Sequence, residues 1–268
     1  MNRRAFFVSD RTGITAETLG ASLLTQFPDI EFKRTNIPFV SNELAAHAAV
    51  ATIQRAADED QLAPLVFSTL TDLIVQKIVA TSSPHFFDLF GTFIAPLESA
   101  LGCQSSHTAG RMHGVFDAGA YDKRMQALNF TLSHDDGLSP RDLKEADLVL
   151  LGVSRSGKTP TCLYLAMHYS LKTANYPLTD DDFGSIKLPK ILQPCRDKLY
   201  GLTIAPEQLS RIRRERRATG DYSSLVRCRA EIAMADAIFR TENIQYIDTT
   251  TVSIEEIAAT VVRDMGLH

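Results

Sequence analysis

Residues 152–159 read Gly152-Val153-Ser154-Arg155-Ser156-Gly157-Lys158-Thr159. This order fits the template of a phosphate-binding loop: a glycine, four free positions, then Gly-Lys-Ser/Thr. In such a loop the glycines allow backbone N–H groups to turn inward as an anion nest. The pattern predicts that all eight residues surround the phosphates of a nucleotide. Lys158 would contact the terminal phosphates, and the Thr159 hydroxyl would hold Mg²⁺.

The flanking sequence places this loop between a strand and a helix. Residues 146–151 form the apolar run of a strand that is buried on both faces. After the loop, Leu163, Ala166 and Met167 recur at helical spacing, and Pro160 is tolerated in a first helical turn. The phosphates would then meet a helix N-terminus, which favours anions. An ordinary glycine turn is the alternative.

The sequence predicts a further strand and helix at the C-terminal end of the chain. Residues 244–250 read as a strand that ends in polar residues, and Ser253 with Glu256 makes the capping box of a following helix. Small kinases with a phosphate loop often end in this way. A capped terminal helix on any α/β sheet would look similar.

Short apolar runs alternate with helical patterns along the first hundred residues, which predicts an N-terminal α/β domain. Ala16, Leu19 and Leu23 keep helical spacing, and Ser41 is a candidate cap for a helix that runs through Ile53. The expected strands are 5–8, 32–40, 64–70 and 86–94.

The domain boundary is expected where the chain becomes polar and irregular, between 102 and 119. We therefore expect an α/β protein of two domains. Residues 1–110 would form the N-terminal α/β domain, and residues 111–268 a P-loop kinase-like α/β domain that starts with a helix near 120–132.

Composition excludes several functional classes. The chain has 268 residues, 44% of them hydrophobic, and a net charge of −4, which gives no reason to expect bulk binding to nucleic acid or a membrane. No apolar run approaches the length of a membrane span or a signal peptide. The four cysteines lack metal or disulfide spacing and favour core positions in a protein of the reducing cytoplasm. The oligomeric state stays open, with a homodimer among the alternatives.

Two acidic clusters are candidates for catalysis. Asp10 lies in Ser9-Asp10-Arg11-Thr12-Gly13, at the carboxyl end of the first expected strand, where sites of α/β proteins commonly form. Asp135 and Asp136 lie in His134-Asp135-Asp136-Gly137, shortly before the loop. An acceptor hydroxyl in phosphoryl transfer must be oriented and deprotonated, and Asp136 or Asp135 could serve. Ordinary polar turns explain both clusters as well.

Arginines crowd the helix expected after Pro206. Their guanidinium groups could close over phosphates as a lid, or they could form a solvated helix face with surface ion pairs. The arginines are Arg211, Arg213, Arg214, Arg216 and Arg217.

Taken together, several segments resemble one family, the regulatory proteins of phosphoenolpyruvate synthase. This bifunctional kinase/pyrophosphorylase family also includes regulators of pyruvate, phosphate dikinase. In the dikinase branch the second loop glycine is usually a serine, so Gly157 favours the synthase branch. The resemblance runs nearly end to end, through residues 9–17, 134–137, 152–161, 174–177, 201–204, 212–217 and 265–267.

The resemblance implies an ADP-dependent kinase that phosphorylates a threonine of phosphoenolpyruvate synthase and so inactivates it. It also implies a phosphorylase that reverses this step with inorganic phosphate and releases pyrophosphate. The Gly152–Thr159 loop would bind ADP with Mg²⁺, and inorganic phosphate would use the same nest.

Two other classes remain open. A small-molecule kinase of the shikimate or nucleotide type would need only the loop and the C-terminal strand and helix, but the long N-terminal half argues against it. A nucleotide-sensing module without chemistry would bind ADP tightly and leave no phosphothreonine on a partner.

Overall fold

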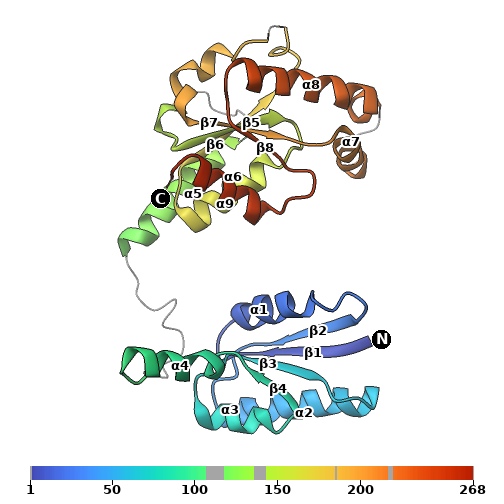
Figure 1. Ribbon diagram of the computed structural model, residues 1–268, viewed down its shortest axis with the longest axis vertical. Coiled ribbons are helices and arrows are strands. Elements are labelled where there is room, and N and C mark those ends of the chain that lie inside the picture. The colour runs from blue at the N-terminus through green and yellow to red at the C-terminus, as the bar shows by residue number, and fades with distance from the viewer. Residues whose placement is uncertain (1, 107–117, 136–142, 185, 217–219, 268) are drawn as a thin grey trace. The chain divides into compact units, whose positions relative to one another are not determined.

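The computed structural model describes residues 2–106, 118–135, 143–184, 186–216 and 220–267. The chain divides into two compact units, Met1–Val115 (unit 1) and Phe116–His268 (unit 2). Each unit contains its own four-stranded parallel sheet (Figure 1), so the predicted α/β class is confirmed. The expected linker lies mostly at 107–117, outside the described residues.

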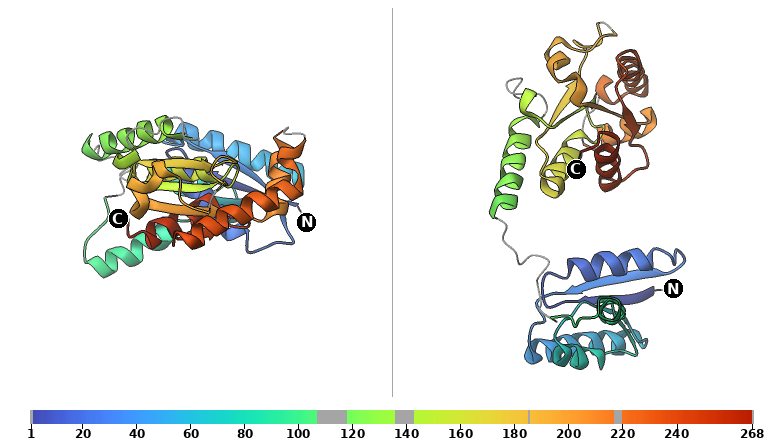
Figure 2. Two further views of the ribbon diagram at one scale, coloured as in Figure 1. Left: turned by 90° about the horizontal axis from the view of Figure 1, so that it is seen from above. Right: turned by 60° about the vertical axis from the view of Figure 1, so that its left-hand side comes forward.

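Unit 1 has the strand order β2-β1-β3-β4, with helices on both faces of the sheet (Figure 2). Successive side chains of a strand point to opposite faces. Accordingly, Phe6 and Val8 pack with α2 and α3, whereas Ala5 and Phe7 pack with α1. The elements are β1 (Asn2–Val8), α1 (Ile14–Leu24), β2 (Glu31–Ile37), α2 (Glu43–Asp60), β3 (Leu65–Ser68), α3 (Leu73–Ala80), β4 (His85–Asp88) and α4 (Gly91–Leu101).

Unit 2 has the strand order β6-β5-β7-β8. Every residue of β5 is buried, as predicted for a strand covered on both faces: Val149 and Leu151 contribute to one core layer, Leu148 and Leu150 to the other. The elements are α5 (Ala118–Ser133), η3 (Leu143–Glu145), β5 (Leu148–Val153), α6 (Lys158–Tyr169), β6 (Thr173–Leu178), η4 (Lys190–Lys198), β7 (Leu199–Thr203), α7 (Pro206–Glu215), η5 (Asp221–Ser223), α8 (Leu225–Thr241), β8 (Tyr246–Asp248) and α9 (Ile254–Asp264).

The prediction of a strand at 86–94 is wrong beyond Asp88. β4 ends at Asp88, and α4 begins at Gly91. The Asp88 carboxylate accepts the Gly91 N–H at 2.8 Å, and its carbonyl accepts the Thr92 hydroxyl at 2.6 Å. These local bonds start a helix where the apolar pattern alone suggests a continued strand.

The segment after β2 also differs from expectation. Phe39 has a φ of 61°, a left-handed conformation that cannot continue a strand, so the expected strand at 32–40 stops at Ile37. The cap of α2 is Asn42 rather than Ser41, because the Asn42 side chain accepts the Ala45 N–H at 2.9 Å.

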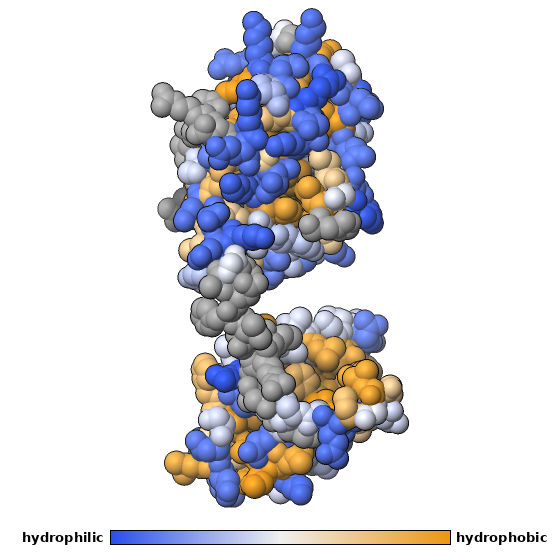
Figure 3. Space-filling view, turned by 90° about the vertical axis from the view of Figure 1, so that its left-hand side faces the viewer, coloured by the Kyte–Doolittle hydropathy of each residue, from blue (hydrophilic) through white to orange (hydrophobic). Residues whose placement is uncertain are grey.

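α4 buries none of its side chains fully within unit 1. Phe93, Leu97 and Leu101 are exposed at helical spacing, and apolar side chains gather on this unit's surface (Figure 3). α4 therefore contributes apolar surface rather than core.

The four cysteines are free. Cys162, Cys195 and Cys228 are buried as expected, but Cys103 is exposed. Within the described ranges, no helix is long and apolar enough to cross a bilayer.

The predicted capping box of α9 is present. The Glu256 N–H donates to the Ser253 hydroxyl at 3.3 Å, and the Ser253 N–H donates to the Glu256 carboxylate at 2.9 Å. This backbone hydrogen bond lowers the pKa of Glu256.

Ser253→Ala should lower the free energy of unfolding by about 1 kcal/mol, because an N-terminal N–H of α9 loses its acceptor. The measurement is urea unfolding of both proteins. The pKa of Glu256 is lower in the folded chain than in the unfolded one. The Glu256 carboxylate therefore stabilises the fold at pH values above the ordinary glutamate pKa, and this stabilisation is lost as the pH falls through the lowered folded-state pKa. A Ser253→Ala protein as stable as the wild type near neutral pH would contradict the prediction.

Candidate active site

The Gly152–Thr159 loop joins the carboxyl end of β5 to α6. β5 lies between β6 and β7, so the chain leaves it toward one neighbour and later returns on the other side. Ligands of parallel α/β sheets bind at this type of reversal point, outside the carboxyl ends of the strands. The topology of unit 2 therefore places the loop at the position where a site is expected.

The loop backbone is held in unusual conformations. Arg155 has a φ of 76° and Gly157 a φ of 94°. A left-handed conformation is uncommon for a residue with a side chain and persists only where the surroundings enforce it. At Gly152 the constraint is space, because a Cβ there would lie 2.4 Å from the carbonyl oxygen of Leu202. Alternating backbone conformations of this kind form concavities lined by N–H groups.

Donors from three parts of unit 2 bind carbonyl oxygens of the loop. The C=O and N–H of a trans peptide point in opposite directions. A donor that binds a loop carbonyl therefore points the N–H of the next residue away from that donor. The bonds run from Lys158 Nζ to Val153 at 2.9 Å, from Arg213 Nη2 to Ser154 at 3.1 Å, and from Thr249 Oγ1 to Ser156 at 3.2 Å.

Ser156 supplies an observation that points to a ligand. Its side chain is 1% exposed, and its hydroxyl has no hydrogen-bond partner among the described residues. Buried polar groups are normally paired, because an unpaired one costs about 1–3 kcal/mol. The buried Lys158 follows two residues later. A hydroxyl, an ammonium group and inward N–H groups together suit the oxygens of a phosphate.

A carboxylate, a hydroxyl and an amide meet at the start of α6. Asp135 Oδ1 accepts hydrogen bonds from the Thr159 hydroxyl at 2.8 Å and from the side-chain amide of Asn175. The Asn175 amide also lies 3.4 Å from the Thr159 hydroxyl. Oxygen atoms of these types are the ligands that Mg²⁺ prefers. The cluster fits a magnesium ion held by one or two protein oxygens and water.

The end of α5 positions Asp135. His134, the preceding residue, is buried, and its ring stacks on Phe130 with centroids 3.9 Å apart. His134 Nδ1 lies 2.8 Å from the Phe130 carbonyl oxygen, and the His134 carbonyl accepts the Asn175 N–H at 3.3 Å. The helix end is thereby joined to β6, and Asp135 is brought beside Thr159.

The two other predicted carboxylates are Asp136 and Asp10. Asp136 lies outside the described residues. Asp10 belongs to unit 1, where its carboxylate accepts the N–H of Thr71 at 3.3 Å and the Thr71 hydroxyl at 2.7 Å. The structure thus brings Asp135 and Thr159 together, and Asp10 joins the ends of β1 and β3.

Sequence reasoning missed Asn175 and Thr249 as site residues, and it placed Arg213 either in a lid over phosphates or on a solvated helix face. A buried asparagine within the mostly apolar β6 was a usable signal for the first. Neither alternative for the arginine cluster fits Arg213: its side chain is fully buried and lies 2.6 Å from Glu231. Arg211, Arg214 and Arg216 are exposed.

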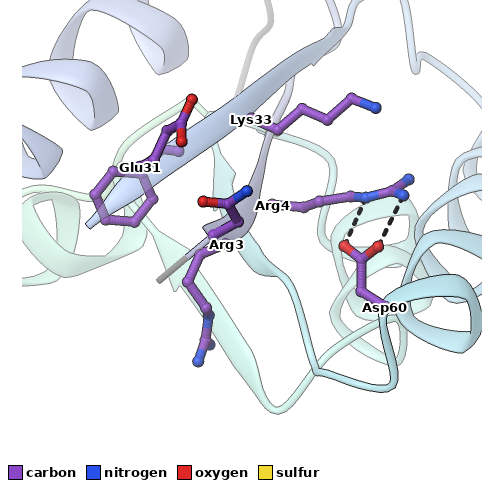
Figure 4. Close-up of a pocket in the computed structure, with 7 residues that line it drawn as sticks. Arg3, Arg4, Glu31, Lys33 and Asp60 are labelled. Carbon is purple, nitrogen blue, oxygen red and sulfur yellow. Dashed lines mark hydrogen bonds and ion pairs between the residues drawn. The ribbon is translucent and has the colours of Figure 1, made fainter.

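Unit 1 has a hollow at the amino ends of β1 and β2 (Figure 4). It carries both charge signs, from Arg3, Arg4 and Lys33 and from Glu31 and Asp60. Arg4 binds Asp60 at 2.7 Å, so part of this charge is neutralised. Ligands of parallel sheets bind at the opposite, carboxyl end. The Ser156 hydroxyl, the buried Lys158 and the contact between Asp135 and Thr159 assign the candidate site to the Gly152–Thr159 loop.

Comparison with known proteins agrees with an α/β enzyme of the kinase type. Residues 5–262 match the family described as Kinase/pyrophosphorylase. The chain belongs to this kinase/pyrophosphorylase family.

Similar proteins match over nearly their whole length and carry the name "Putative phosphoenolpyruvate synthase regulatory protein". One from Marinobacter nauticus is 46% identical over 267 residues, which cover 100% of this chain and 98% of the relative. One from Alkalilimnicola ehrlichii is 50% identical, with 99% and 97% covered. One from Bordetella pertussis is 49% identical, with 100% and 98% covered.

The two loop glycines should respond differently to alanine. Gly152→Ala should lower the free energy of unfolding by about 3 kcal/mol, because the new Cβ meets backbone that cannot easily move. Gly157→Ala should cost about 1 kcal/mol, since its site is open and only its left-handed conformation is penalised. Urea unfolding measures both, with Gly184→Ala at an open position as control. Equal losses at the two glycines would contradict this account.

Proposed function

We propose that this chain is a bifunctional serine/threonine kinase and phosphorylase that regulates phosphoenolpyruvate synthase. As a kinase it transfers the terminal phosphoryl group of ADP to a threonine of the synthase, leaving AMP and an inactive synthase. As a phosphorylase it transfers the same group from phosphothreonine to inorganic phosphate, which releases pyrophosphate and restores the hydroxyl. The family description supports the pair of activities, and the names of the relatives support the partner.

The Gly152–Thr159 loop carries this proposal. Its N–H groups, Lys158 and the Ser156 hydroxyl, which has no hydrogen-bond partner in the described part of the chain, would bind the two phosphates of ADP. Lys158 would exchange the Val153 carbonyl for a phosphate oxygen and neutralise charge on the group in transfer. Thr159 and Asp135 would hold the Mg²⁺ that shares this task.

The reverse reaction uses the same groups. Inorganic phosphate is a tetrahedral anion of the same size as the terminal phosphate of ADP, so the same nest would hold it beside the phosphothreonine. Its oxygen would attack the phosphorus, and the P–O bond to threonine would break. One loop would therefore serve both directions.

The carboxylates would divide two tasks. Asp135 is engaged by Thr159 and Asn175, which suits a carboxylate that holds the metal site. Asp136, the next residue, would orient the acceptor threonine and receive its proton. We place the reaction in the cytoplasm, where the four free cysteines stay reduced.

Lys158→Ala should remove ADP binding and both activities, because one loop binds ADP in one direction and phosphate in the other. Calorimetric titration with ADP and Mg²⁺, a phosphothreonine assay on the synthase and a pyrophosphate assay measure the three effects. Lys187→Ala, which removes an exposed lysine elsewhere in unit 2, is the matched control and should retain all three. An intact dephosphorylation rate in folded Lys158→Ala would exclude a shared site.

Asp136→Asn should retain ADP binding, since the loop supplies it, yet slow threonine phosphorylation by roughly 10²- to 10⁴-fold, as expected for loss of a general base. Asp135→Asn should instead raise the Mg²⁺ concentration needed for half-maximal rate, because its carboxylate holds the metal site. Rates are measured as phosphothreonine formed on the synthase at several Mg²⁺ concentrations. Full phosphorylation by Asp136→Asn would move the role of base to Asp135 or Asp10.

A further inference from the structure

A buried charged cluster lies behind the loop, built from α7, η5 and α8. The Arg213 side chain is fully buried, and its Nη2 lies 2.6 Å from a carboxylate oxygen of Glu231. Its guanidinium group lies 4.0 Å from the centre of the Tyr222 ring and donates to the Tyr222 carbonyl at 2.9 Å. The guanidinium group also lies 3.8 Å from Cys228 Sγ, so Glu231, Tyr222 and Cys228 all contact it.

Arg213 and Tyr222 both contact Ser154, the third residue of the loop. Arg213 Nη2 donates to the Ser154 carbonyl at 3.1 Å, and the Tyr222 hydroxyl donates to Ser154 Oγ at 2.9 Å. One residue of the loop is thus held at its backbone and at its side chain by neighbours 59 and 68 positions away in sequence.

Stability alone is a weak explanation for this cluster. The cost of burying two charges largely offsets their attraction, and an apolar group of similar volume often stabilises a core as well. Glu231 also accepts from Arg227 Nε at 2.7 Å, so two guanidinium groups share one carboxylate. What an apolar side chain cannot supply is a donor to the Ser154 carbonyl.

The orientation of the peptide between Ser154 and Arg155 depends on that donor. Since the C=O and N–H of a trans peptide point in opposite directions, fixing the Ser154 carbonyl on Arg213 aims the Arg155 N–H away from the cluster. Arg155 itself is left-handed, with a φ of 76°, which its surroundings must enforce.

We propose that Arg213 and Tyr222, with Glu231 behind them, are positioning residues that fix the Ser154–Arg155 peptide with its N–H toward the phosphate of the nucleotide. They act through Ser154 and do not touch the nucleotide. This inference rests on the proposed role of the loop as a phosphate site.

The first test is Tyr222→Phe, which removes one hydroxyl and keeps the ring beside Arg213. Its Kd for ADP, measured by calorimetry with Mg²⁺, should rise about 3- to 10-fold, the usual effect of losing one hydrogen bond. Tyr200→Phe is the matched control: it also loses a tyrosine hydroxyl of unit 2, bonded at 2.8 Å to Asp264, and should keep the wild-type Kd. Unfolding temperatures are recorded for both.

The second test separates positioning from general destabilisation. If Tyr222 acts through the Ser154 hydroxyl, the effects of Ser154→Ala and Tyr222→Phe on the Kd for ADP should be non-additive. The Kd of the double variant should then not exceed the higher of the two single-variant Kd values. Tyr200→Phe should not couple to Ser154→Ala. Arg213→Lys, which keeps the charge but loses the fork of donors, should raise the Kd further.

The outcomes are distinguishable. A wild-type chain that does not bind ADP contradicts the proposed function together with this inference. ADP binding by the wild type with an unchanged Kd in Tyr222→Phe, or additive effects in the double variant, overturns the inference and leaves the proposed function standing. These two results hold even if Arg213→Lys does not fold.

Discussion

The candidate site depends on how the carbonyl oxygens of the Gly152–Thr159 loop are satisfied. A loop that turns its N–H groups inward must turn its carbonyls outward, and buried carbonyls need donors. Arg213 and Thr249 supply them from α7 and from the turn after β8, and Lys158 of the loop itself supplies a third. An anion nest in this chain is therefore made by residues outside the nest as much as by its glycines.

The parallel sheet explains why those donors meet at one place. β5 is buried between two core layers and leads into α6 with Lys158. Its neighbour β7 leads into α7 with Arg213, and β8, which pairs with β7, leads to Thr249. In a parallel sheet all carboxyl ends face the same edge. Segments that lie far apart in sequence thus deliver side chains to the same loop.

Features encoded by neighbouring residues were predictable from the sequence. The buried strand β5, the loop that follows it and the Ser253 capping box each depend on residues a few positions apart, and all three are present. Arg213 was not predictable, because an arginine in a run of arginines reads as surface, and only its packing against Glu231 reveals a buried role. The contact between Asp135 and Asn175 likewise joins residues 40 positions apart. At β4 the local bonds of Asp88 overrode an apolar pattern that reads equally as a strand.

The close approach of Gly152 to Leu202 limits how this chain can diverge. The atom in the way is a main-chain oxygen, so exchanging the leucine for a smaller residue creates no room. A larger residue at 152 would need β7 to move as a whole, and with it the strand pairing to β5 and β8. A second mutation at 202 cannot remove this clash, because it would change only the side chain, which itself packs in the core. Residue 152 is therefore constrained by the backbone of β7, whichever side chain stands at position 202.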